Sequence, residues 1–362
     1  MAHVEQSLSM PSPWRGKRVF ITGTTGFKGA WMTLLLDRLG ATVAGYALAP
    51  PTQPSLFTVA GLEDTGSHRI ADIRDIASLI AAMKEFAPDV VFHMAAQSLV
   101  RLSYDIPVET YDVNVMGTIH ALEAIRQTPS VKAGVVVTSD KCYENREMIW
   151  GYRETDAMGG HDPYSSSKGC AELVTAAYGK SFFQPGKSHA AIASVRAGNV
   201  IGGGDWARDR LMADIARGLI AGEKIVIRRP DALRPWQHVL EPLHGYLAVA
   251  ERLLNDNRTW EGWNFGPDMD CEQRVEVVAR TACEFWGKPD ALEIRPDPNA
   301  LHEATLLKLD STKARNALDW RPKWNFRTTI QNTMEWYRRF AKGADMRAFT
   351  LEQIDAYRGD GK

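Results

Sequence analysis

The stretch Lys17-Arg-Val-Phe-Ile-Thr-Gly-Thr-Thr-Gly-Phe-Lys-Gly29 decides the fold of this chain. It begins as a short apolar run, passes through three glycines with the spacing GxxGxxG, and leads into a helical pattern at residues 30–39. Glycines at such a turn let the backbone bend tightly and approach a pyrophosphate, whose charge is favoured at a helix N-terminus. The stretch therefore predicts a strand, a dinucleotide-binding turn and a helix, although the usual fingerprint is GxGxxG.

Apolar strands and helical patterns alternate further along the chain. The strand patterns lie at residues 41–45, 89–93, 133–138 and 191–195, and the helical patterns at residues 76–86, 108–126 and 164–183. Strands that are apolar on both faces and alternate with helices indicate a parallel sheet covered on both sides. We therefore predict an α/β fold class, a Rossmann-like doubly wound parallel sheet with a smaller C-terminal α/β substrate-binding lobe.

The sequence pattern changes after about residue 200, where loops rich in glycine and proline separate shorter strand patterns. This change predicts a domain boundary. We expect residues 1–13 to form a flexible tail and residues 14–200 the dinucleotide-binding domain, with residues 239–262 returning to it. Residues 201–238 and 263–362 then form the substrate lobe.

Composition excludes several classes of protein. Among 362 residues, 43 Lys and Arg nearly balance 44 Asp and Glu, which argues against nucleic-acid binding. No apolar run approaches the length of a membrane span, and Met1–Pro13 has no signal-peptide pattern. The four cysteines have no metal-ligand spacing. We expect a cytoplasmic protein with no bound metal, and no membrane or nucleic-acid partner.

Two short stretches carry the candidate catalytic residues. Tyr164 and Lys168 are four residues apart and share a helix face, where an ammonium group would lower the pKa of the phenol and make it a general base. Ser139, Asp140 and Lys141 follow the strand at residues 133–138, at the sheet edge where open α/β sheets bind ligands. Either pattern alone also fits an ordinary surface pair, but their joint occurrence favours catalysis.

These motifs resemble the extended short-chain dehydrogenase/reductase family, from about Gly16 to Trp324. The resemblance implies NAD as cofactor and further places residues 72–73 at the adenine, residues 95–97 along the cofactor, and Asn114 in a typical helix segment. The predicted cofactor-binding residues are Gly23, Thr25, Gly26, Phe27, Lys28, Gly29, Asp72, Ile73, Ala95, Ala96, Gln97, Asn114, Tyr164 and Lys168.

The end of the second strand departs from the family pattern. NAD enzymes commonly place an acidic residue there to hold the ribose hydroxyls. Here the strand runs Gly45-Tyr-Ala-Leu-Ala-Pro50, with neither a carboxylate nor an arginine for the extra phosphate of NADP. We expect NAD, held loosely.

Within the family, the Ser139–Lys141 stretch resembles the nucleotide-sugar 4,6-dehydratases, which commonly have Asp-Glu where this chain has Asp140-Lys141. The resemblance implies that Ser139 binds the reacting hydroxyl and that Tyr164 takes the proton of the sugar 4-hydroxyl during oxidation at C4. Elimination of water across C5 and C6 and return of the hydride to C6 follow. We expect Lys141 as the C5 base and Asp140 as the acid, and the reverse assignment stays open.

Several polar residues beyond residue 195 could hold the nucleotide diphosphate. Guanidinium groups match phosphate geometry, so Arg196 and the residues after it are candidates, whereas Trp206 and Trp236 fit the core better. Four stretches, at residues 139–143, 202–206, 234–239 and 303–310, resemble the members that act on CDP-glucose. The resemblance implies CDP-glucose as substrate and a deoxysugar product for surface polysaccharide. The candidate substrate-binding residues are Arg101, Asn199, Arg208, Arg210, Arg234 and His302.

Alternative functions share much of this pattern. A nucleotide-sugar C4-epimerase has the tyrosine, lysine and cofactor but needs no elimination, which Asp140 and Lys141 argue against. A 4,6-dehydratase of a dTDP- or GDP-sugar differs only in the base that it binds. A non-catalytic NAD-binding regulatory protein has no need for the four catalytic residues. The resemblance also implies a homodimer or a tetramer formed through residues 108–126 and 164–183.

Overall fold

The computed structural model describes residues 12–65, 67–256, 260–296 and 306–359. The predicted tail at residues 1–13 falls almost wholly outside these ranges, and so does His302. Among the described residues, no helix is both long and apolar enough to cross a membrane.

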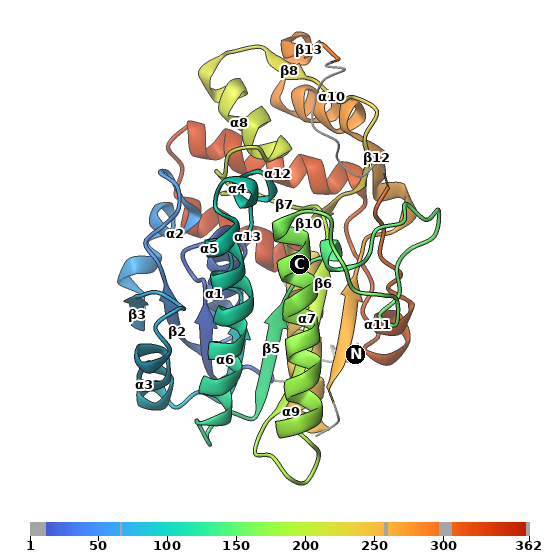
Figure 1. The fold of residues 1–362 in the computed structure, drawn as a ribbon. Coiled ribbons are helices and arrows are strands. Elements are labelled where there is room, and N and C mark those ends of the chain that lie inside the picture. Colours follow the sequence, from blue (N-terminus) through green and yellow to red (C-terminus); the bar gives the residue numbers. More distant parts are fainter. Residues whose placement is uncertain (1–11, 66, 257–259, 297–305, 360–362) are drawn as a thin grey trace, which may run out of the picture.

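A seven-stranded parallel sheet forms the centre of the molecule (Figure 1). Its strand order is β11-β6-β5-β4-β1-β2-β3, and each neighbouring pair runs parallel. The order reverses between β1 and β4, which is where doubly wound sheets open a crevice for ligands. The strands are β1 (Arg18–Thr22), β2 (Thr42–Ala47), β3 (Ser67–Ile70), β4 (Val90–His93), β5 (Ala133–Val137), β6 (Ala191–Ala197) and β11 (Glu261–Phe265).

Helices cover both faces of this sheet, as the apolar strands predict. On one face, α3 (Ile76–Phe86), α6 (Gly117–Arg126) and α7 (Pro163–Phe182) enclose a core that includes Phe20 and Val136. On the other face, α1 (Phe27–Arg38) and α9 (Leu240–Asn255) enclose a larger core. The predicted Rossmann-like α/β class is confirmed.

Two local features differ from the sequence expectations. The edge strand β3 was not predicted, because its side chains are mostly exposed and show no apolar alternation. The helix expected at residues 108–126 is divided into α5 (Pro107–Tyr111), a π-helical turn η2 (Asp112–Met116) and α6. Such π-turns occur frequently at functional sites. The sheet region also contains four short helical elements, α2 (Leu56–Val59), η1 (Leu62–Asp64), α4 (Val100–Asp105) and η3 (Asp140–Cys142).

A second group of elements packs around its own apolar cluster, at the top of Figure 1. Its larger helices are α8 (Leu211–Ala221), α10 (Val275–Trp286) and α12 (Phe326–Ala341). Trp236 lies in this cluster and Trp206 in the larger core, so both are core residues as expected. The remaining elements are β7 (Val200–Ile201), β8 (Ile225–Ile227), β9 (Leu233–Pro235), β10 (Gln237–His238), η4 (Met269–Cys271), β12 (Glu272–Arg274), η5 (Pro289–Ala291), β13 (Leu292–Ile294), α11 (Thr312–Ala317) and α13 (Met346–Arg358).

The chain crosses between the two groups more than once. The helix α9 packs on β5 and β6, and β11 then extends the sheet as far as Phe265. The last helix, α13, packs against α1, where Arg38 pairs with Asp355 at 2.7 Å and Arg347 with Asp37 at 2.8 Å. The domain division drawn from the sequence stays a prediction.

Candidate active site

The glycine turn between β1 and α1 fits a pyrophosphate. Gly23 has φ 82°, and a Cβ there would lie 2.7 Å from the backbone nitrogen of Ala95. A Cβ on Gly29 would lie 2.1 Å from the carbonyl oxygen of Gly23, so the fold itself requires these two glycines. A Cβ on Gly26 would meet only the Gly23 carbonyl oxygen, at an ordinary 3.4 Å. The fold leaves open space at Gly26, as close approach of a ligand requires.

The N-terminus of α1 faces this turn with no side-chain cap at Gly26. Uncapped N–H groups at a helix start are an anion site. Lys28 follows in the first turn, where burial and the positive charge of Arg210 lower its pKa to about 8. The charges of Asp140 and Lys168 also act on the Lys28 ammonium group. The cofactor turn and the predicted catalytic residues are therefore brought together.

The segment after β4 is held by the π-turn. The buried Asn114 accepts a hydrogen bond from Gln97 N at 2.9 Å and donates to Gln97 O at 3.0 Å and to Ser167 Oγ at 2.9 Å. The amide of Asn114 thus ties the Ala95–Gln97 backbone to α7. In this arrangement Asn114 orients the predicted cofactor segment from behind.

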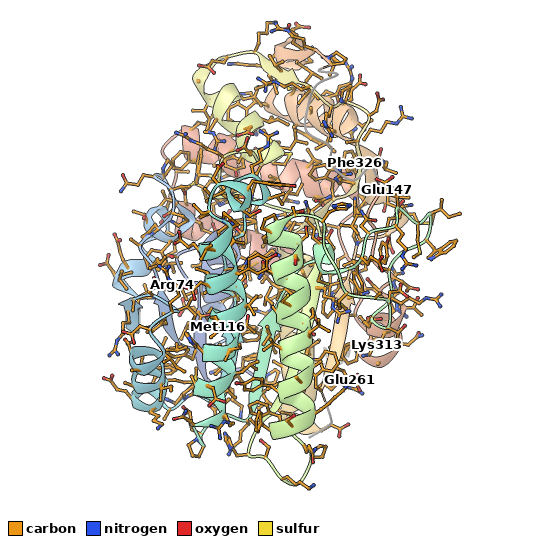
Figure 2. The ribbon with its side chains drawn as sticks, viewed as in Figure 1. Arg74, Met116, Glu147, Glu261, Lys313 and Phe326 are labelled. Carbon is orange, nitrogen blue, oxygen red and sulfur yellow. The ribbon has the colours of Figure 1, made fainter. Side chains whose placement is uncertain are left out.

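The predicted adenine residues lie beside β3. Ile73 is buried against Gly117, and a Cβ on that glycine would come within 3.0 Å of it. The carboxylate of Asp72 pairs with Arg74 at 2.6 Å, and this hydrogen bond holds the Asp72 pKa below its usual range. Figure 2 labels Arg74 on the surface of the molecule. At the end of β2, Leu48 is exposed, and its carbonyl oxygen accepts a hydrogen bond from Thr25 Oγ1 at 2.9 Å.

Tyr164 and Lys168 lie on the first two turns of α7, which begins at Pro163 and is capped by the side chain of Asp162. Both side chains are buried. Lys168 Nζ donates to the carbonyl oxygen of Val137 at 3.4 Å, so it lies beneath the end of β5. Burial lowers the pKa of Lys168 to about 8, against the raising effect of the Glu172 charge.

Ser139, Asp140 and Lys141 form the turn at the end of β5. Ser139 Oγ donates to Asp140 Oδ1 at 2.9 Å and accepts from Lys141 N at 3.2 Å. Burial raises the pKa of Asp140, opposed by the positive charges of Lys141 and Arg234 and by the Ser139 hydrogen bond. A raised pKa favours the protonated carboxyl group, which is the form that a general acid requires.

The pKa of Tyr164 contradicts one sequence expectation. Spacing predicted that Lys168 would lower it, but burial raises the Tyr164 pKa to about 12 in the chain alone. The hydrogen bond with Ser139 and the charge of Arg210 lower this pKa, while the charge of Asp140 raises it. Helical spacing failed here because it reports a shared face and cannot report burial.

Gly198 fixes where the Asp140 carboxyl group lies. A Cβ on Gly198 would stand 1.9 Å from Asp140 Oδ2, so the two groups are in contact. The next residue, Asn199, has φ 45°, and its buried Nδ2 has no hydrogen-bond partner among the residues that the structure describes. An unpaired buried donor at this edge is available for a ligand.

The predicted substrate arginines differ in their surroundings. Arg210 binds Asp205 at 2.7 Å and Ser98 Oγ at 3.0 Å. Arg234 bonds to the carbonyl oxygen of Leu233 at 2.9 Å and acts by charge on Asp140. The other two predicted arginines, Arg101 and Arg208, are exposed.

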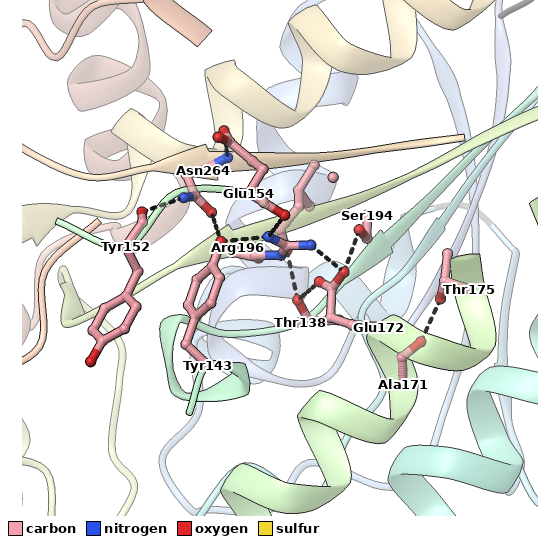
Figure 3. A network of polar contacts seen from close by, with 12 residues as sticks. Thr138, Tyr143, Tyr152, Glu154, Ala171, Glu172, Thr175, Ser194, Arg196 and Asn264 are labelled. Atoms are coloured by element: carbon pink, nitrogen blue, oxygen red, sulfur yellow. Dashed lines mark hydrogen bonds and ion pairs between the residues drawn. The ribbon is translucent and has the colours of Figure 1, made fainter. Parts of the chain in front are cut away.

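Arg196 is not available for a diphosphate, contrary to expectation. Its side chain is fully buried and pairs with Glu172 at 2.7 Å (Figure 3). Sequence reasoning also missed Glu172 and Gly198. Glu172 could have been found from its position, because it continues the i, i+4 face of Tyr164 and Lys168 by one turn. Gly198 had no such local signal, since its contact with Asp140 exists only in three dimensions.

The parallel sheet, the glycine turn that fits a pyrophosphate, and the buried tyrosine and lysine define a class of dinucleotide-dependent enzymes. The sequence model of the family described as GDP-mannose 4,6 dehydratase matches residues 20–333, and the chain belongs to this family. Its resemblance to the extended short-chain dehydrogenase/reductases is thereby confirmed.

Within this family, the chain is 51% identical over 348 residues to CDP-glucose 4,6-dehydratase of Salmonella typhimurium, covering 95% of this chain and 97% of that protein. Solved structures agree. UDP-glucose 4-epimerase of Thermus thermophilus in complex with NAD is 26% identical, with a TM-score of 0.74 over 89% of this chain and 99% of that chain. The fold also matches dTDP-glucose 4,6-dehydratase of Bacillus anthracis, with a TM-score of 0.75 at 22% identity over 92% and 100% of the two chains.

Proposed function

We propose that this chain is an NAD-dependent CDP-glucose 4,6-dehydratase, which converts CDP-glucose to CDP-4-dehydro-6-deoxy-D-glucose and water. The observation that carries the proposal is the turn at the end of β5, where Asp140 with a raised pKa stands between Ser139 and Lys141. An elimination needs an acid and a base besides the group that serves the oxidation. The 51% identity to a CDP-glucose 4,6-dehydratase supports the nucleotide and the sugar.

Tyr164 and Ser139 serve the oxidation in this proposal. Ser139 donates a hydrogen bond to the substrate oxygen at C4, and Tyr164 accepts the proton from the same hydroxyl in its phenolate form, which the positive charge of Lys168 is proposed to favour. NAD, when bound at the glycine turn, accepts the hydride from C4 and returns it to C6. Arg210 assists because its positive charge lowers the Tyr164 pKa against burial.

Lys141 and Asp140 serve the elimination. Lys141, in its neutral amine form, takes the proton at C5, which the 4-ketone makes acidic, and the protonated carboxyl group of Asp140 gives its proton to the leaving hydroxyl at C6. Burial favours this direction because it raises the pKa of Asp140. The reverse assignment needs an ionised Asp140, which burial opposes.

The substrate diphosphate is proposed to bind between the glycine-rich segment after β7 and the strand β9. Asn199 supplies an unpaired buried amide, and Arg210 and Arg234 supply charge next to the catalytic turn. Arg208 and Arg101 stand further out as exposed groups, and His302 is kept as a sequence prediction.

The reaction can be tested by mass spectrometry of nucleotide sugars incubated with the protein and NAD. We expect CDP-glucose to lose the mass of one water, while dTDP-glucose and GDP-mannose stay unchanged. Loss of water from another nucleotide sugar in preference to CDP-glucose would support the dehydratase reaction but refute CDP as the nucleotide of the substrate. A new isomer without mass loss would identify an epimerase, and cofactor binding with no turnover would identify a silent binder.

Lys141→Ala tests the assignment of the C5 base. Oxidation at C4 is followed in a single turnover by the absorbance of reduced cofactor, and elimination is followed by product formation. We expect the variant to slow elimination far more than oxidation. Lys132→Ala, an exposed lysine at the other end of β5, is the control. Equal loss of both steps would contradict the role of Lys141.

We also propose that the chain forms a homodimer, in keeping with the cytoplasmic enzyme expected from the sequence. Large apolar side chains are exposed on α4, α5, η2 and α7, and Figure 1 shows these helices on one face of the molecule. An apolar patch of this kind marks an interaction site, and its extent along α7 and the neighbouring α5 and η2 suits a second copy. The residues are Leu102, Tyr104, Val108, Tyr111, Met116, Leu173 and Phe182.

Sedimentation of charge variants tests this dimer. Val108 and Met269 are each 82% exposed, but Met269 lies on η4, away from the patch. We expect Val108→Asp to weaken dimerisation at least about tenfold and Met269→Asp to leave it unchanged. A wild-type chain that sediments as a monomer would refute the dimer.

A further inference from the structure

Glu172 continues the catalytic face of α7 into the interior. It follows Tyr164 by eight residues and Lys168 by four, and its side chain is 1% exposed. Figure 3 shows the donors that surround its carboxylate. Ser194 Oγ and Arg196 Nη2 each donate to Oε2 at 2.7 Å, and Thr138 Oγ1 donates to Oε1 at 2.5 Å.

These donors come from two neighbouring strands: Thr138 follows the last residue of β5, directly before the catalytic turn, and Ser194 and Arg196 lie on β6. Thr138 lies directly before Ser139, and its backbone N–H donates to the carbonyl oxygen of Val195 at 2.9 Å. Arg196 lies two residues before Gly198, which contacts the carboxyl group of Asp140. One carboxylate therefore connects α7 with the ends of β5 and β6.

The charge of Glu172 acts on Lys168 from below. Burial of Lys168 lowers its pKa, and the Glu172 carboxylate is the largest influence that raises it. Glu172 itself stays ionised because Arg196 holds its pKa below the usual range despite burial.

The other titratable groups around Lys168 come from three further elements. His93 on β4 is neutral at working pH because burial lowers its pKa to about 3, and Cys142 on η3 is neutral because burial raises its pKa. Lys28 on α1 is a second cation, and its charge opposes that of Lys168. The negative charge of Glu172 thus raises the pKa of Lys168, against desolvation and the positive charge of Lys28, which lower it.

We propose that Glu172 is a positioning residue for the dehydratase reaction: its bonds to Thr138, Ser194 and Arg196 fix the end of β5, where Lys168 and the Ser139–Asp140 turn lie, and its carboxylate places a negative charge one helical turn beyond Lys168. The inference rests on the proposed function for its kinetic readout. A purely structural role for the buried pair makes a different prediction, because a fold defect lowers activity equally at every pH. Loss of a charge partner instead changes the pH at which Lys168 loses its proton.

Three variants separate these outcomes. Glu172→Gln removes the charge and leaves Arg196 buried without its partner, which is costly to the fold. Glu172→Gln with Arg196→Met removes both charges, so the folded protein is retained if the single variant fails to fold. Glu172→Asp keeps the charge and should restore wild-type behaviour. Glu241→Gln is the matched control, since Glu241 is also fully buried and hydrogen-bonded but lies on α9 and binds Tyr357.

The kinetic measurement is kcat against pH with CDP-glucose and NAD. We expect the alkaline limb to move down by about one pH unit in both charge-removing variants, a roughly tenfold loss above pH 8 with less than about threefold loss near pH 6.5. The Glu172→Asp and Glu241→Gln variants should keep the wild-type limb. A uniform loss across pH, or an unmoved limb, would overturn the inference.

A second measurement does not depend on turnover. Trace acetylation with acetic anhydride across pH, followed by mass spectrometry of the Lys168 peptide, reports the proton equilibrium of that lysine. We expect its midpoint to fall by about one pH unit in the charge-removing variants, while the exposed Lys180 on the same helix is unchanged. An unmoved midpoint would refute the inference even in an active enzyme. Absence of turnover by the wild-type chain would refute only the proposed function.

Discussion

The turn at the end of β5 and the arginine-bearing segment after β7 differ in how far their charged side chains are buried. At the turn, Asp140 and Lys168 are each 5% exposed and bonded within the fold. In the segment after β7, Asp209 pairs with Arg101 of α4 at 2.8 Å, and the side chains remain 52% and 58% exposed. Arg210, paired with Asp205, is intermediate at 32%.

This difference separates groups that are positioned beforehand from groups that can exchange partners. Buried charges need fixed bonds, because desolvation is costly and every partner counts. Exposed ion pairs contribute little and can be replaced by a ligand phosphate at small cost. We therefore expect the turn to carry out the chemistry and the segment after β7 to recognise the substrate.

The largest expected effect is at the turn itself. Tyr164→Phe removes the hydroxyl that accepts the substrate proton, and general acid–base groups contribute roughly 10² to 10⁴ in rate. We expect kcat to fall about 10³-fold with the free energy of unfolding nearly unchanged. Steady-state kinetics and urea unfolding measure both quantities. A fall of less than tenfold would remove Tyr164 from the chemistry and break the contrast between the regions.

Gly198→Ala tests whether the turn is as fixed as its burial implies. The added Cβ would stand 1.9 Å from Asp140 Oδ2 and must displace the carboxyl group. Misplacement by about 1 Å can cost roughly 10²-fold in rate, so we expect a loss of that order in the elimination step. In an Asp140→Asn background, Gly198→Ala should lower the rate little further, because the carboxyl group that it displaces is already absent. Full additivity would show that Gly198 acts elsewhere.

The two arginines test the recognition region. We expect Arg210→Met to lower kcat/KM by roughly 10- to 30-fold, because its charge reaches both Lys28 and Tyr164. Arg101→Met removes an exposed ion pair, worth at most about 1 kcal/mol, so we expect less than about fivefold. Kinetics with CDP-glucose at saturating NAD measure the ratio. Equal losses of kcat/KM in the two variants would show that burial of an arginine does not decide its contribution to substrate recognition.

The smallest expected effect is on acid stability. Burial lowers the pKa of His93 and of His238 to about 3, whereas unfolded histidine binds a proton near pH 6.5. The unfolded state therefore gains protons first, and stability is lost as pH falls from 6.5 towards 3. We expect each histidine to cost roughly 1 kcal/mol between pH 6.5 and 5.5.

Urea unfolding at several pH values measures this loss. His93→Gln should reduce the slope with pH, because the amide can hydrogen-bond to Thr22 and Thr118 without titrating. His161→Gln, at an exposed position, is the control and should leave the slope unchanged. Identical slopes in all three proteins would show that burial of His93 does not govern acid stability.

Much of the fold was predictable from local pattern. The apolar strands at residues 89–93 and 133–138 are β4 and β5, because strands buried on both faces have an unmistakable composition. The edge strand β3 was missed because most of its side chains are exposed, so it lacks this apolar composition. The helical spacing of Tyr164 and Lys168 correctly placed both on α7, and the glycine turn was correctly placed before α1.

By itself the sequence determined which residue types stand at the ends of which strands and helices, since periodicity and turn chemistry are local properties. Tertiary structure alone decided their charge states and partners. It raised the pKa of Tyr164 where spacing predicted a lower one, and it turned Arg196 from a candidate phosphate ligand into the buried partner of Glu172. The physical reason is that desolvation and ion pairing depend on what surrounds a group from every side, and neighbours in space are set by the whole fold.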